Sequence, residues 1–396
     1  MLNIRKYKFV IFILAAFLVG GLITVGVLDY FKLILKDGSR ALSSAEYGSY
    51  QEFMDRYTRV DELRTFLKDS FYREIEDDTI MTGLFRGLFE SPDDPFTTYF
   101  TKEELEEALA RTNGEMTGIG ITFILNDSNY IEIKSVIPDS PAEKAGLKPG
   151  DILTRIDNTD FSSPGADLDA VVNVTKGEAG TEVIVSVLRD GERIEFTIVR
   201  DHFITPSVLS KILDDNIGYI AISTFNQGTA EDFEAAIRDM EDKEVKGLII
   251  DVRNNNGGIV DQAMLMLDVM IGESIVAYTE DREGNREPFT TSDGKISIPY
   301  AVLVNKHSAS AAEIFALGIK NMQEGVVIGE TTFGKGVIQK LIRFGQGDGA
   351  RITVMQYVTP DGTPVHERGI DPDIAIAPDA EGKTDPVLDK AKEILK

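Results

Sequence analysis

Residues 300–320 read YAVLVNKHSASAAEIFALGIK. The apolar run Tyr300–Val304 is typical of a buried strand, and Ala311–Lys320 is typical of a helix. The small residues between them predict a strand-to-helix junction that exposes a reactive group at the start of the helix. There the backbone N–H of Ala311 would point at developing negative charge, assisted by the helix dipole.

The same alternation of strand and helix continues on both sides of this stretch. Strands are expected at 218–223, 247–252, 275–278, 300–304 and 326–328, and helices at 230–240, 259–269 and 311–320. This pattern predicts an α/β layer around a largely buried sheet, because strands covered on both faces read as apolar runs. The spacing of apolar residues is helical from Tyr47 to Ala110, and 385–395 is expected to form a short amphipathic helix.

A second junction of the same kind lies at Asp251–Gly258, between an expected strand and an expected helix. The backbone amides of Gly257 or Gly258 could supply the other donor of an oxyanion hole. Such a donor is worth roughly 10²–10³ in rate where it has been tested in serine proteases. Both junctions follow the carboxyl ends of strands, which is where α/β sheets place their sites.

The segment Gly329–Gln339 holds a lysine between two glycines. Its start matches the Walker A pattern Gly-x-x-x-x-Gly-Lys, but Gly336 replaces the Ser or Thr that would hold magnesium, so nucleotide binding is disfavoured. Lys335 suits the role of a general base instead. Desolvation would disfavour its ammonium form and lower its pKa from about 10.4, so that the neutral amine can accept a serine proton.

The region from Gly114 to Arg200 has a different pattern, with short strands between glycine turns. Strands are expected at 119–125, 130–136, 151–157, 182–189 and 194–199. Gly118-Ile119-Gly120-Ile121, followed by Asp139–Leu147 and Gly150–Asp157, resembles a bacterial PDZ domain.

The Gly118–Ile121 segment is the expected peptide-binding loop of this domain. The N–H groups of Ile119, Gly120 and Ile121 would form a nest for a terminal carboxylate, and a peptide would add as a strand beside Ile121–Leu125. Asp167–Val174 would be the helix that walls the groove. A tight turn without binding is the simpler explanation of an isolated Gly-x-Gly, but the motif that follows favours binding.

Three motifs in order are similar to those of the C-terminal processing (tail-specific) protease family. They are Asp251–Gly258, Ser308–Ile314 and Thr332–Gln339, and the closing Gly369–Ile374 also agrees. The resemblance runs from about Asp93 to Ile374. It implies an α/β protease core of the crotonase-like layered type, a homodimer built through the N-terminal helices and the C-terminal tail, and no cofactor.

The resemblance also assigns the catalytic residues. The nucleophile maps onto Ser310, the base onto Lys335, and a glutamine that positions the lysine onto Gln339. Two alternatives stay open from the residues alone: Ser308 as nucleophile with Ser310 capping the helix, and His307 as base. Arg253 and Glu313 are expected to brace the two loops.

The predicted function is therefore a serine endopeptidase that recognises protein C-termini. A trypsin-like protease with a PDZ domain is disfavoured because the chain lacks Gly-Asn-Ser-Gly. The alternative from another class is a catalytically silent, membrane-tethered PDZ adaptor that only binds C-terminal peptides. An adaptor has no need of Ser310, Lys335 and Gln339 together.

Composition excludes several other classes. The chain has 396 residues, a formal net charge of −25 and no cysteine. Disulfides, cysteine nucleophiles and thiolate metal sites are therefore excluded, and the acidic balance disfavours nucleic acid as a ligand. The three histidines, His202, His307 and His366, are too scattered for a zinc site.

The N-terminus carries an uncharged run, Phe9–Leu28, preceded by Arg5, Lys6 and Lys8. Its 20 residues would span about 30 Å as a helix, which matches a bilayer core. A cleaved signal peptide is disfavoured because a small-x-small site, Ala41-Leu42-Ser43, comes too late. We expect a single-pass protein of the cell membrane whose catalytic part lies outside the cytoplasm.

The predicted organisation has seven parts. They are a cytoplasmic flank at 1–8, a transmembrane signal-anchor at 9–28, a linker at 29–46, a helical region at 47–110, a PDZ domain at 111–203, a Ser/Lys protease core at 204–378 and a helical tail at 379–396.

Overall fold

The computed structural model describes residues 44–292, 294–379 and 382–396. The predicted transmembrane segment at 9–28 lies outside these residues. Among the helices of the described part, none combines the length and the apolar character needed to cross a bilayer. The chain divides after Gly87 into two compact units.

The described residues of the unit before the division are helical, as the apolar spacing predicts. It contains α3 (Ser44–Ser70) and most of α4 (Asp77–Glu90). The Arg64 guanidinium on α3 donates to both carboxylate oxygens of Asp77 at the start of α4, at 2.6 and 2.8 Å. The apolar residues of α3 that gave the helical spacing remain 39–51% exposed, as at Val60 and Leu63. They therefore add little apolar burial to the folding of this chain.

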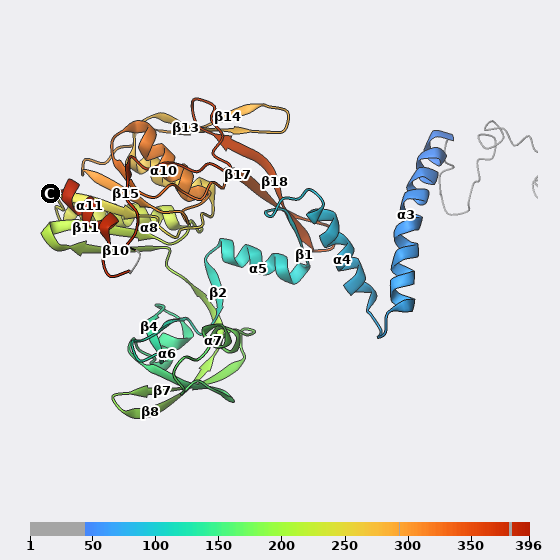
Figure 1. Cartoon of the computed structure of the whole chain (residues 1–396), viewed down its shortest axis with the longest axis horizontal. Helices are drawn as coiled ribbons and strands as arrows, with labels where there is room; N and C mark the ends of the chain where they lie inside the picture. Colours follow the sequence, from blue (N-terminus) through green and yellow to red (C-terminus); the bar gives the residue numbers. More distant parts are fainter. Residues whose placement is uncertain (1–43, 293, 380–381) are drawn as a thin grey trace, which may run out of the picture. The chain divides into compact units, whose positions relative to one another are not determined.

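A small β-domain occupies the first part of the second unit (Figure 1). Its sheet has the order β3-β4-β5-β7-β8, with bounds Ile121–Leu125, Ile131–Val136, Ile152–Ile156, Glu182–Arg189 and Glu192–Val199, and β6 (Thr159–Asp160) pairs with β5. Two helices, α6 (Pro141–Ala145) and α7 (Leu168–Thr175), complete it. Its core consists of buried residues that include Ile131, Ile133, Leu153, Val185 and Val187. The predicted strands are confirmed to within two residues at each end.

Short elements flank this β-domain in the sequence. Helix α5 (Lys102–Thr112) precedes it, with Thr101 capping the helix N-terminus, and β2 (Glu115–Gly118) pairs antiparallel with β9 (Asp201–Ile204). The β2–β9 pair thus brings together the two ends of the segment that forms the β-domain.

The α/β part is built on a sheet with the order β10-β11-β12-β15-β16-β19. The bounds of these strands are Val208–Leu213, Ile217–Ile222, Gly247–Asp251, Tyr300–Val304, Val326–Gly329 and Ile374–Ala375, and η1 (Asp214–Asn216) joins the first two. Only the β10–β11 pair is antiparallel. The connecting helices are α8 (Thr229–Asp242), α9 (Val260–Met270) and α10 (Ala311–Met322).

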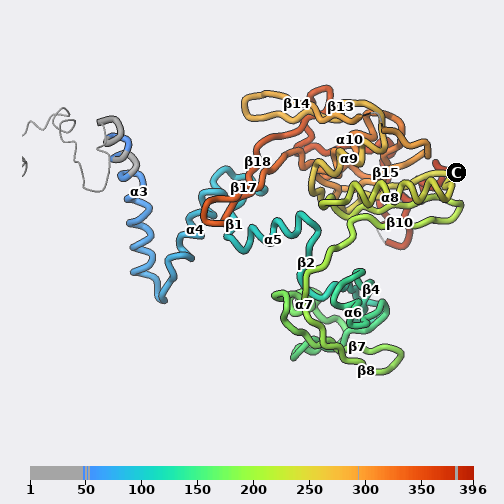
Figure 2. Tube along the Cα trace, turned by 180° about the vertical axis from the view of Figure 1, so that it is seen from behind, coloured from blue at the N-terminus to red at the C-terminus, as the bar shows by residue number. Residues whose placement is uncertain are grey.

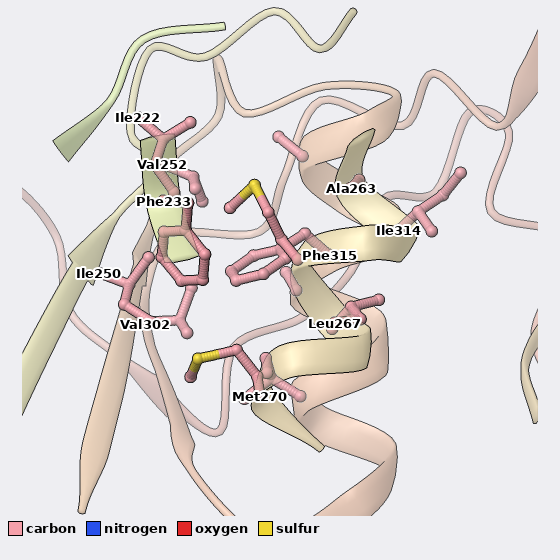
Figure 3. Packing of buried hydrophobic residues seen from close by; sticks show 14 of the residues in the cluster. Ile222, Phe233, Ile250, Val252, Ala263, Leu267, Met270, Val302, Ile314 and Phe315 are labelled. Carbon is pink, nitrogen blue, oxygen red and sulfur yellow. The ribbon is translucent and has the colours of Figure 1, made fainter. Parts of the chain in front are cut away.

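Both faces of this sheet are covered, which explains its continuous apolar strands. Alternate residues such as Ile250 and Val302 pack against Phe233 and Phe315 from the helices (Figure 3). The intervening residues face the other way and pack against Val387 and Ala391 of α11 (Pro386–Ile394) and against Leu395, which follows it. The predicted α/β layer and the predicted C-terminal helix are therefore confirmed.

A second, antiparallel sheet in this part was largely missed by the sequence pattern. Its order is β1-β18-β13-β14, with bounds Thr98–Phe100, Gly349–Val358, Ser274–Glu280 and Arg286–Thr291, and β17 (Val337–Arg343) also pairs with β18. The long β17–β18 hairpin is visible in Figure 2. The sheet matters for the site because β18 lies between the segment before β1 and the loop that carries Lys335.

Candidate active site

Ser310 lies between β15 and α10 in a backbone conformation rarely adopted by a residue with a side chain. Its φ is 56° and its ψ is −119°. Such backbone strain persists only where surrounding contacts enforce it, and it is common at functional sites. A Cβ on Gly257 would lie 2.8 Å from Ser310 Cβ, so the tight approach of the two junction loops requires glycine there. The two predicted junctions therefore meet at Ser310.

Glu313 joins the serine junction to the lysine loop. Its side chain is fully buried, and Oε2 accepts from the backbone N–H of both Ser310 and Lys335, at 2.8 Å each. Oε1 accepts from Gly334 N–H (2.7 Å) and Thr332 Oγ1 (2.6 Å). A buried carboxylate needs such partners to offset desolvation. The expectation that Glu313 braces the loops is confirmed.

We expect Glu313→Gln to lower kcat by about 10²-fold, because one amide nitrogen cannot accept and the Ser310–Lys335 geometry shifts. The free energy of unfolding should fall by about 1–3 kcal/mol, since a buried donor loses its acceptor. Steady-state kinetics and denaturant unfolding measure the two effects. Glu330→Gln, a partly exposed carboxylate on the same loop, is the control, and equal kinetics in both variants would contradict this account.

Lys335 is half-buried, and its amine faces an aromatic ring. Burial lowers the pKa of Lys335 below its usual value, and the nearby Arg351 lowers it further, while Asp94 and Glu313 oppose the shift. Its Nζ lies 4.4 Å from the centroid of Phe96. Among the described residues, no hydrogen bond joins Lys335 Nζ to Ser310 Oγ. The cation–π contact favours the charged amine, whereas a general base must be neutral.

Strand β18 holds the Phe96 segment in place. Arg351 Nε donates to the carbonyl oxygen of Phe96 (3.1 Å), and Thr353 N–H donates to Thr97 Oγ1 (3.1 Å). The side-chain amide of Gln339, on β17, donates to Thr353 Oγ1 at 3.3 Å. Gln339 therefore lies on the same hydrogen-bonded segment, and its assignment as the residue that orients Lys335 stays a prediction.

The lysine loop packs closely against the segment that follows β18. A Cβ on Gly336 would lie 2.2 Å from the backbone nitrogen of His366, so only glycine fits there. Glu367 N–H donates to Gly334 O, and Tyr357 N–H donates to Gly336 O. These contacts fix the loop backbone on both sides of Lys335.

The candidate oxyanion donors differ in their availability. The N–H of Gly257 is already taken by Asn255 Oδ1 at 2.8 Å. In the described part of the chain, the N–H groups of Gly258 and Ala311 have no acceptor within hydrogen-bond distance. Of the two glycines left open by the sequence, only Gly257 thus has its N–H occupied, and the role of Gly258 and Ala311 as oxyanion donors stays a prediction.

The two alternative catalytic residues occupy other surroundings. Ser308 is fully buried, and its hydroxyl donates to the carbonyl oxygen of Val252 at 2.8 Å. His307 is exposed and lines a cavity of about 650 Å³ with Tyr219 and Arg253, among others, and Ser310 does not line this cavity. The Ser308 hydroxyl is therefore already hydrogen-bonded, and the assignment of Ser310 in its place stays a prediction.

Arg253 does not connect the two loops, so that expectation was wrong. Its guanidinium donates to both oxygens of Asp251 and both oxygens of Asp385, just before α11. Burial works against the charged guanidinium, but these hydrogen bonds outweigh it and raise the pKa of Arg253. Arg253 therefore ties the end of β12 to the C-terminal helix.

The expected peptide-binding loop of the β-domain lies before an edge strand. β3 pairs only with β4 among the described strands, which leaves its other edge for strand addition. Within the described residues, the N–H groups of Ile119 and Gly120 contact no acceptor. Ile121 is the first residue of β3 and pairs with Val136.

Two residues near the site were missed by the sequence analysis. Phe96 lies within the stretch 47–110 that was expected to be helical, and its aromatic ring beside Lys335 gave no local signal. Tyr357 is buried at the end of β18, and its hydroxyl contacts the carbonyl oxygens of Ser310 and Lys335. A buried tyrosine in an apolar strand is ordinarily a core residue.

Comparison with known proteins agrees with this arrangement. Residues 216–376 match the profile of peptidase family S41, and residues 117–199 match that of a PDZ domain. The carboxy-terminal processing protease CtpA of Bacillus subtilis (strain 168) is 33% identical over 357 residues, covering 89% of this chain and 75% of that protein. CtpB of the same strain is 33% identical over 330 residues, covering 82% of this chain and 68% of that protein.

A solved structure described as an S41 protease, from Bacteroides fragilis NCTC 9343, has the same fold. Its TM-score is 0.55 at 19% identity, over 77% of this chain and 87% of that one. The small β-domain is thus a PDZ domain and the α/β part is a serine protease core. The chain belongs to peptidase family S41, among the carboxy-terminal processing proteases.

Proposed function

We propose that this protein is a membrane-anchored serine endopeptidase that recognises protein C-termini through its PDZ domain and hydrolyses peptide bonds with Ser310 and Lys335. The observation that carries the proposal is the single carboxylate oxygen of Glu313 that binds the N–H groups of both residues. It holds a strained serine at a helix start beside a lysine whose amine is desolvated.

In the proposed reaction, the Lys335 amine leaves the Phe96 ring and accepts the proton of Ser310 Oγ as the oxygen attacks the scissile carbonyl carbon. The N–H groups of Ala311 and Gly258 donate to the resulting oxyanion. Collapse of the tetrahedral intermediate breaks the C–N bond, and the Lys335 ammonium returns the proton to the leaving amine. Water then attacks the ester with Lys335 again as base, which releases the acid and regenerates Ser310.

The proposal gives the PDZ domain the role of substrate recognition. Its support is that, in the part of the chain that the structure describes, one edge of β3 is free and the N–H groups of Ile119 and Gly120 have no acceptor. A terminal carboxylate is an acceptor for such converging amides, and an extended peptide gains main-chain hydrogen bonds along a strand edge.

The remaining parts of the proposal rest on the sequence and on the family resemblance. The uncharged run at 9–28 is the proposed single-pass anchor, with the protease outside the cytoplasm. Family resemblance is the ground for proposing a homodimer and a crotonase-like layering of the protease core.

Covalent labelling of the full chain with a serine-directed phosphonate tests the nucleophile. We expect labelling and hydrolysis of an unstructured protein in the wild type and in Ser308→Ala, and neither in Ser310→Ala. The two serines lie on one junction, so Ser308→Ala is a matched control. Labelling of Ser310→Ala at the wild-type rate would contradict the proposal. Absence of labelling and hydrolysis in all three, with C-terminal peptides still bound, would instead indicate a silent adaptor.

A further inference from the structure

We infer that Tyr357 is a positioning residue whose hydroxyl sets the spacing of Ser310 and Lys335 by binding the carbonyl oxygens of both. The inference rests on the proposed Ser310–Lys335 mechanism and adds a residue to it. It also specifies where that residue acts, which is on the backbone of the catalytic residues and not on the substrate.

The hydrogen bonds that Tyr357 donates go to the two catalytic loops. Its Oη lies 3.1 Å from the carbonyl oxygen of Lys335 and 3.3 Å from that of Ser310, as a three-centre hydrogen bond. Its own backbone N–H donates to the carbonyl oxygen of Gly336 at 2.9 Å. The side chain is fully buried, so water does not compete for the hydroxyl.

Tyr357 complements Glu313. The Glu313 carboxylate accepts from the N–H groups of Ser310 and Lys335, and the Tyr357 hydroxyl donates to their carbonyl groups. Each of the two residues is therefore held at both of its backbone polar groups. Burial, and then the Glu313 charge, raise the pKa of Tyr357 well above its usual value, so the hydroxyl keeps its proton.

A purely structural role is the competing explanation, since the Tyr357 ring is part of the main hydrophobic core. Tyr300 separates the two explanations. It belongs to the same core, and its buried hydroxyl has no hydrogen-bond partner among the described residues. Tyr300→Phe removes the same atom from the same core, but among the described residues it breaks no hydrogen bond, whereas Tyr357→Phe removes the bonds to both catalytic loops.

The test compares Tyr357→Phe, Tyr300→Phe and Ser310→Ala in the full chain with an unstructured protein substrate. We expect Tyr357→Phe to lower kcat by about 10- to 100-fold with KM within twofold, because a small misplacement of reacting groups has this effect. Tyr300→Phe should keep both constants within twofold. Thermal unfolding checks that each variant is folded, and end-point phosphonate labelling counts the active sites in every variant that keeps Ser310.

Each outcome has one meaning. Wild-type kcat in Tyr357→Phe overturns the inference and leaves the proposed function intact if Ser310→Ala is inactive. A loss of kcat that matches a loss of folded, labelled sites also overturns it, since the role is then structural. Activity in Ser310→Ala instead contradicts the proposed function itself. Lower kcat per labelled site, found only in Tyr357→Phe, supports the inference.

Discussion

Replacement of Lys335 by alanine is expected to lower turnover by about 10⁴-fold or more, and Ser310→Ala by a similar factor. The serine hydroxyl is a weak nucleophile without a base, and without the serine the amine has no hydroxyl proton to accept. Because the two act as a unit, the double variant should be no slower than either single one. Hydrolysis of an unstructured protein by the full chain measures all three.

The control for this set is Lys340→Ala. Lys340 is an exposed lysine on β17, five positions after Lys335. Its replacement removes the same charge without touching the site, so turnover should stay within twofold of wild type. Wild-type turnover in Ser310→Ala or in Lys335→Ala would contradict the proposed Ser/Lys mechanism.

Activity is also expected to fall at mildly acidic pH, by about tenfold per pH unit below the pKa of the base. Only the neutral amine of Lys335 accepts the serine proton, and protonation inactivates it. Burial lowers the pKa of Lys335 below the ordinary 10.5, so the neutral form becomes available at lower pH than for an exposed lysine. A profile of kcat/KM from pH 5 to 9 measures this limb, and a flat profile would contradict Lys335 as base.

Phe96→Leu makes the pH prediction more specific. The ring stabilises the ammonium form by about 1 kcal/mol, so its removal should move the acidic limb to lower pH. Phe344→Leu, which alters another partly exposed ring of the same unit, should leave the limb in place. A limb that does not move in Phe96→Leu would show that the 4.4 Å contact does not govern the titration.

The sequence predicted the elements whose signal is local. The strand Tyr300–Val304 and the strand Glu182–Arg189 have the predicted bounds, because continuous or alternating apolar residues end at polar or glycine turns. The helix start at Ala311 was also predicted. The two junctions could be placed together because the carboxyl ends of parallel neighbours share one edge of a sheet.

The parts that could not be predicted depend on contacts between distant residues. β17 and β18 have mixed, half-exposed patterns in which Lys340 and Arg351 interrupt the apolar residues. The contact between Phe96 and Lys335 joins segments more than 230 residues apart, and it depends on β1 pairing with β18. The local sequence indicates that Arg253 lies in a loop. It does not indicate that Arg253 binds Asp385, which precedes the C-terminal helix.

The close packing at Gly336 has a consequence for the timescale of activation. His366 packs against that glycine, and Glu313 and Tyr357 bind the neighbouring backbone. These contacts hold the backbone of the loop that carries Lys335 in place. The Lys335 amine therefore moves from the Phe96 ring to Ser310 Oγ by rotations about the four carbon–carbon bonds of its own side chain. Such rotamer exchange takes picoseconds to nanoseconds, whereas a loop rearrangement takes nanoseconds to microseconds or longer. The approach of the Lys335 amine to Ser310 Oγ should then be much faster than cleavage of the peptide bond at ordinary turnover numbers.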